Sequence, residues 1–121
     1  ANPLSVKSAI QNFSNIQKKG KKKYFLFGDM LELGKNSLIY HKKISKLINN
    51  SDIDKTFTYG EKSLETYKFL KKNKKGAVVK DLKLFKNQIL KILRNGDFLM
   101  IKGSNATNLH NFSKRFAGGI I

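Results

Sequence analysis

The chain has 121 residues, enough for one domain with its own core but too few for two. Its apolar content of 40%, with nine Phe and four Tyr, argues against a disordered chain. It has no cysteine, which excludes a disulfide framework and a thiolate metal site.

The net charge of +17 suggests a nucleic-acid-binding protein, but the kind of basic residue argues against one. Of the 25 basic residues, 23 are lysines spread along the chain, and only Arg94 and Arg115 offer the guanidinium that base readout favours. The chain is also rich in Asn and Ile, as expected from an AT-rich genome. We therefore interpret the charge as a solvated lysine coat with weak, non-specific attraction to polyanions at low salt.

Targeting signals are not evident in the sequence. No apolar run approaches the roughly 18 to 20 residues that span a bilayer, and the start at Ala1 does not resemble a signal peptide. We expect a cytoplasmic protein that binds no membrane. Because the chain lacks an initiating Met, we also expect it to be a piece of a longer protein.

The first predicted element is a helix from Pro3 to about Gln17. Asn2 is a suitable N-cap, and Pro3 fits the first helical position. Its apolar residues recur with a period close to 3.6, at Val6, Ile10, Phe13 and Ile16. Gly20, inside a basic connector, is well placed to stop this helix.

Short apolar strands then alternate with helices. Strands are expected at residues 24–27, 55–59, 77–79 and 98–101, where apolar runs end at turn residues. Helices are expected at about 37–49, 61–72 and 82–93, followed by a last one carrying Leu109, Phe112 and Phe116. On the second helix, the residues expected to face inward are Leu38, Ile44, Leu47 and Ile48. The tail Gly118–Ile121 is left unassigned.

This alternation predicts the fold class. Right-handed crossovers between successive strands place them parallel, so we expect an α/β domain of Rossmann-like, three-layer type. Its sheet should be mostly parallel, with helices on both faces.

Polar residues beside glycine mark three of the four strand ends. In parallel sheets, ligands bind beyond the carboxyl ends of the strands, where helix N-termini offer free N–H groups. The three corners are Gly28-Asp29, Gly60-Glu61 and Lys102-Gly103-Ser104-Asn105. The fourth strand end, Lys80-Asp81, lacks glycine.

Two of these corners have side chains suited to a ligand. Asp29 and Glu32 could hold a cation, a ribose or an ammonium group, unless Asp29 only caps a turn and Glu32 is solvated. The Lys102 corner suits a carboxylate or phosphate, because charge, side-chain donors and the helix dipole act together. The alternative interpretation of this corner is that Ser104 or Asn105 forms an ordinary helix N-cap.

Catalytic machinery is not recognisable in this sequence. His41 and the weaker candidate His110 are single histidines in predicted helices, where histidine is more often structural. No phosphate-binding loop, dinucleotide fingerprint, catalytic triad or metal-ligand cluster stands out. The sequence therefore indicates half of a binding site, with no catalytic residue and no metal.

Three stretches resemble the MurF-type ligases of the Mur ligase family. Residues 27–34 with His41 resemble their L-G-D-M-x-E-L-G…H signature, which is highly specific. Residues 1–5 resemble the end of their Y-N-A-N-P-x-S segment, and Lys102-Gly103-Ser104 their V-K-G-S turn. The order and spacing fit over nearly the whole chain.

The resemblance implies that residues 1–121 are the C-terminal domain of a three-domain enzyme. In such ligases the central domain binds most of the ATP and Mg²⁺, and the carboxylate of UDP-N-acetylmuramoyl-tripeptide becomes an acyl phosphate. The amine of D-alanyl-D-alanine attacks it, a step in peptidoglycan synthesis. The C-terminal domain closes the site and excludes water. We expect the isolated domain to be inactive and the enzyme to be a monomer with no specific nucleic-acid partner.

Site residues follow from the same resemblance. It places Asn2 and Gly28 at the nucleotide side of the interdomain cleft, and it gives His41 a family position without a role. The residues expected near the dipeptide are Asp29, Glu32, Lys102, Ser104 and Asn105. Lys102, Ser104 and helix N–H groups would receive its carboxylate, while Asp29 or Glu32 would orient its amine or a loop.

One departure from the family pattern bears on this site. Many relatives have Arg after the K-G-S turn, where this chain has Asn105, so carboxylate binding should rely more on Lys102 and backbone donors. Other assignments remain open. They are another Mur ligase, a folylpolyglutamate synthase, a basic polyanion-binding module and a free-standing α/β domain.

Overall fold

The computed structural model describes residues 2–31, 33–104 and Leu109. Its helices are α1 (Pro3–Asn15), α2 (Ser37–Asn49), α3 (Ser63–Lys68) and α4 (Leu82–Ile92), with single 3₁₀ turns η1 (Gly34–Asn36) and η2 (Lys72–Lys74). Its strands are β1 (Lys23–Gly28), β2 (Lys55–Tyr59), β3 (Lys75–Val79) and β4 (Phe98–Lys102). Apart from Leu109, the expected last helix and the tail lie outside the described residues.

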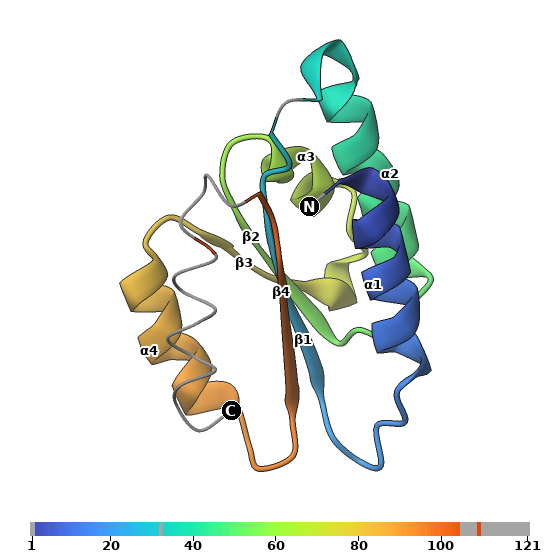
Figure 1. The fold of residues 1–121 in the computed structure, drawn as a ribbon. Helices are drawn as coiled ribbons and strands as arrows, with labels where there is room; N and C mark the ends of the chain where they lie inside the picture. The colour runs from blue at the N-terminus through green and yellow to red at the C-terminus, as the bar shows by residue number, and fades with distance from the viewer. Residues whose placement is uncertain (1, 32, 105–108, 110–121) are drawn as a thin grey trace.

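The four strands form one parallel sheet in the order β3-β2-β1-β4 (Figure 1). The central strand β1 is buried along its whole length, as its continuous apolar sequence predicts. It pairs with β4, which follows it by some 70 residues in the chain, and Phe27 lies opposite Lys102. This pairing places the predicted Gly28 and Lys102 corners at the same end of neighbouring strands.

Helices cover both faces of the sheet, as predicted (Figure 1). Side chains of β1 alternate between two cores, with Phe25 and Phe27 on one side and Tyr24 and Leu26 on the other. The first core is completed by α1 and α2, through Val6, Ile10, Phe13, Ile44 and Ile48. The second is completed by β2, β3, α4 and Leu109, through Phe57, Val79, Phe85 and Ile89. Among the described residues, no helix is long and apolar enough to cross a membrane.

The helix starts follow local side-chain chemistry. The Asn2 side chain accepts the backbone N–H of Ser5 at 2.8 Å, and the Ser5 hydroxyl accepts the N–H of Asn2 at 3.1 Å. This reciprocal cap, with Pro3 in the first turn, fixes the start of α1 as predicted. Asp81 caps α4 with its side chain alone, accepting from the N–H groups of Lys83 and Leu84.

Tertiary contacts correct three of the predicted details. The helix α1 stops two residues early, at Asn15, and the predicted helix 61–72 shrinks to Ser63–Lys68. The chain leaves α3 because the Asn49 side chain, on α2, holds the Phe69 carbonyl at 3.0 Å and the Lys71 N–H at 2.8 Å. Leu38 points outward, with 57% of its surface exposed, because α2 buries its Ser37–His41–Ile44 face instead.

Lys23, the last residue of the basic stretch around Gly20, is fully buried at the start of β1. Its ammonium group binds both carboxylate oxygens of Asp52, at 2.8 and 3.0 Å. It also donates to the carbonyls of Ser14 and Ile16, which end α1. A buried cation is tolerated only when it is paired in this way, so Lys23 fixes α1 against the sheet.

Candidate functional site at the carboxyl ends of the strands

The β1 and β4 corners bind each other directly. The Ser104 N–H donates to the Asp29 carbonyl at 3.0 Å, and the Leu31 N–H donates to the Ser104 hydroxyl oxygen at 2.8 Å. Glycine is required for this approach, because a Cβ on Gly103 would lie 3.1 Å from the Cα of Gly28 and 2.5 Å from Leu109. The two predicted corners therefore form one continuous rim.

The β2 corner is joined to the same rim through Asp29. The Asp29 side chain is only 7% exposed, and its oxygens accept the backbone N–H groups of Lys62 at 3.1 Å and Ser63 at 2.7 Å. The first turn of α3 has N–H groups without a helical acceptor, and the Asp29 carboxylate satisfies two of them. Asp29 thus caps the turn that begins α3, which is the alternative interpretation given for it from the sequence.

His41 lies directly behind this rim, in α2. Its ring is fully buried, with Nε2 accepting the Met30 N–H at 3.1 Å and Nδ1 lying 2.7 Å from the Ser37 carbonyl. No role for His41 was predictable from the sequence, since a single helical histidine carries no signal for a partner in a distant loop.

Lys102 supplies positive charge at the rim. It is the last residue of β4, it is partly buried, and its register opposite Phe27 fixes its position on the sheet. Among the described residues, no three His, Cys, Asp or Glu side chains come together as a metal site. The positive charge of Lys102 suits the binding of an anion at this rim.

The remaining predicted site residues are placed only in part. Asn2 lies at the start of α1, which Figure 1 shows at the same end of the molecule as the carboxyl ends of the strands. Its side-chain oxygen is occupied by the helix cap. Glu32 and Asn105 lie outside the described residues.

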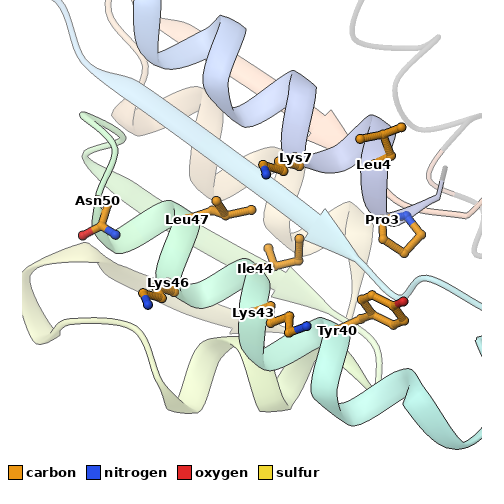
Figure 2. Close-up of a pocket in the computed structure, with 9 residues that line it drawn as sticks. All are labelled: Pro3, Leu4, Lys7, Tyr40, Lys43, Ile44, Lys46, Leu47 and Asn50. Atoms are coloured by element: carbon orange, nitrogen blue, oxygen red, sulfur yellow. The ribbon is translucent and has the colours of Figure 1, made fainter.

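A separate groove, which we did not predict from the sequence, runs between α1 and α2 (Figure 2). It has a volume of about 510 Å³, and none of the described corner residues lines it. Its lining is apolar at Pro3, Leu4, Ile44 and Leu47, with lysines at its margin. The sequence contains one signal for this groove, because Leu4 is an apolar residue outside the apolar stripe of α1. In the structure, 73% of the Leu4 surface is exposed.

Comparison with known proteins adds a family and a fold. Residues 1–105 match the family described as "Mur ligase, glutamate ligase domain". A UDP-N-acetylmuramoyl-tripeptide–D-alanyl-D-alanine ligase of Buchnera aphidicola subsp. Acyrthosiphon pisum is 32% identical over 112 residues, or 87% of this chain and 23% of that protein. The enzyme of the same name from Bacillus subtilis is 44% identical over 61 residues, or 50% of this chain and 13% of that protein.

A solved structure has the same fold. The crystal structure of MurF ligase from Thermotoga maritima in complex with ADP superimposes with a TM-score of 0.78 at 19% identity, covering 98% of this chain and 26% of that one. The chain therefore spans about a quarter of the length of this ligase and of the Buchnera one.

Proposed function

This chain belongs to the Mur ligase family, as its glutamate ligase domain, and we propose that it is the C-terminal domain of a three-domain enzyme. The whole protein is an ATP-dependent ligase that joins D-alanyl-D-alanine to UDP-N-acetylmuramoyl-tripeptide in peptidoglycan synthesis. Support comes from the two similar ligases of that name, together with the family signature at residues 27–34. We further propose that it works in the cytoplasm as a monomer.

ATP and Mg²⁺ belong to the central domain in this proposal. The described residues offer no cluster of carboxylates for a cation, and no strand is followed by a phosphate-binding loop. The residues present here therefore do not fit the triphosphate and its metal. Asn2 and Gly28 form only the margin that faces the nucleotide.

One observation carries the proposal, namely the joining of the β1 and β4 corners through Ser104, Asp29 and Leu31. This contact puts Lys102 beside the signature loop on the rim. Lys102 then receives the dipeptide carboxylate, assisted by Ser104, Asn105 and backbone N–H groups. Because the Asp29 oxygens are engaged by α3, Asp29 acts by shaping the loop, and orientation of the amine falls to Glu32.

This domain makes and breaks no bond in the reaction. Its contribution is to hold the amine of D-alanyl-D-alanine close to the acyl phosphate and to exclude water. Loss of a rim contact should therefore appear mainly as weaker binding of the dipeptide.

The test uses Lys102→Ala in the full-length protein. Removal of a charge-assisted hydrogen bond, worth about 1.5–3 kcal/mol, should raise the dipeptide KM by about 10- to 150-fold and leave the ATP KM within about twofold. Ser104→Ala should raise the same KM, since it releases Leu31. Lys83→Ala, on the exposed side of α4, is the matched control and should change neither constant. An unchanged dipeptide KM in Lys102→Ala would contradict the assignment.

A further inference from the structure

The hydrogen bonds of His41 define its protonation state. A backbone N–H can only donate and a carbonyl can only accept. Nε2 therefore accepts from the Met30 N–H, and Nδ1 carries a proton and donates it in a hydrogen bond to the Ser37 carbonyl. His41 is therefore a neutral imidazole in a single tautomer. Its ring lies against Phe27 of β1, with 5.8 Å between the ring centroids.

Packing alone does not account for a histidine at this position. The side chain is fully buried on the α2 face that also buries Ile44 and Ile48. An apolar residue would fill the same space without the desolvation of two ring nitrogens. The chemistry that a histidine adds here is the acceptor for Met30 and the donor that orients the ring.

The Met30 contact belongs to a series of anchors on three consecutive residues. Asp29 donates its N–H to the Tyr59 carbonyl at 3.2 Å and accepts from Ser104. Met30 donates to His41, and Leu31 donates to Ser104. These residues follow β1 and belong to no helix or strand, so their polar backbone groups depend on such partners.

The anchors close into a ring across three elements. Asp29 caps α3 through Ser63, and Thr66 of α3 donates its hydroxyl to the His41 carbonyl at 2.5 Å. His41 in turn binds Met30, next to Asp29. The loop after β1 is thus held from α2, α3 and β4 at once, and His41 is the α2 member.

We propose that His41 is a positioning residue of the dipeptide site. As the Nδ1–H tautomer it fixes the backbone of residues 29–31, and so holds the signature loop against the corner that carries Lys102. It does not touch substrate, because it is buried behind the loop. The proposal deepens the proposed function and rests on it.

The hydrogen bond itself is tested in the 121-residue chain by NMR, independently of any activity. His41→Gln offers a side-chain carbonyl in place of Nε2, whereas His41→Phe keeps a ring and removes the acceptor. We expect the wild-type ring to carry its proton on Nδ1. We expect the Met30 amide to exchange with solvent about 10- to 100-fold faster in His41→Phe, and within about threefold of wild type in His41→Gln.

Two NMR outcomes would overturn the proposal. One is a proton on Nε2 in the wild-type chain, since that nitrogen could not then accept from Met30. The other is unchanged Met30 exchange in His41→Phe with the rest of β1 equally protected. If His41→Phe does not fold, the proposal is still tested by the tautomer of the wild-type ring and by the Met30 exchange rate in His41→Gln.

The functional consequence is tested in the full-length ligase. His41→Phe should raise the dipeptide KM about tenfold with the ATP KM within twofold, and His41→Gln should restore most of the loss. Ile44→Val, one turn further along the same buried face, is the control that weakens packing without removing a hydrogen bond to the loop. If His41→Phe only lowers the amount of folded enzyme, as Ile44→Val does, His41 is not a positioning residue.

Failure of the proposed function would look different. Wild-type enzyme would then show no ATP turnover that depends on D-alanyl-D-alanine, while the Met30 amide would still report whether His41 holds the loop.

Discussion

Gly60 has two separate reasons to be glycine. Its φ of +117° lies in a region that side chains with a Cβ rarely adopt, and a Cβ there would lie 2.5 Å from the Asp29 carboxylate. The same residue therefore sets the turn after β2 and leaves room for the carboxylate that caps α3. A glycine corner was predictable from the sequence, but the side chain that needs its space was not.

Gly60→Ala should separate these two effects when compared with Gly20→Ala. Gly20 also has a positive φ, of 81°, but nothing lies within 4 Å of its added Cβ. We expect Gly20→Ala to destabilise the fold by about 1 kcal/mol from backbone strain alone, and Gly60→Ala by about 2–4 kcal/mol. Urea denaturation measures both. Equal losses would mean that the contact with Asp29 contributes nothing.

Among the elements, β1 is held at its first residues by two carboxylates. Asp54 accepts the Lys23 N–H at 2.8 Å and the Lys18 ammonium at 3.0 Å, and Asp97 accepts the N–H groups of Lys22 and Arg94, both at 2.9 Å. Burial raises the pKa of Asp54, but the Lys23 N–H and the Lys18 charge outweigh it, so the pKa is lowered overall. In Asp97, backbone N–H donors likewise outweigh burial and lower the pKa.

Lowered carboxyl pKa values give this end of the sheet an acid-sensitive stability. The stabilisation is present above the unfolded pKa of about 3.9 and is lost as the pH falls through the lower, folded value. Asp54→Asn should therefore cost about 1–2 kcal/mol at neutral pH, and progressively less as the pH falls below the unfolded pKa and the wild-type carboxyl becomes protonated. Urea midpoints across this pH range measure the difference. A constant gap between the two proteins would contradict the charge-based account.

At the scale of the whole molecule, the charge of +17 predicts binding that is strong at low salt and unselective. We expect the chain to bind heparin or random-sequence DNA at about 0.02 M salt and to lose both by about 0.2 M, because binding releases counterions. Anisotropy titrations with two unrelated DNA sequences measure this. A sequence preference that persists at physiological salt would instead favour the polyanion-binding alternative.

Much of the architecture was determined by the sequence itself. The bounds of α2 and β2, the Asn2 cap and the parallel alternation of strands and helices were predicted and are confirmed. Each depends on apolar periodicity or on a side chain within three residues of the backbone group it caps. Such signals are short-range, so they are legible in a single sequence.

The site was predictable only as a set of corners. Its polar residues stand out beside glycines at strand ends, but their partners lie far along the chain. Leu31 and Ser104 are 73 positions apart, and Asp29 and Ser63 are 34 positions apart. The burial of Lys23 and the contact of His41 with Met30 were not predicted for the same reason. Sequence periodicity determines which residues share a face of one element. The placement of β4 beside β1 and of α3 against α2 decides which polar groups meet. The physical reason is that hydrogen bonds form only between atoms that packing has brought within about 3 Å.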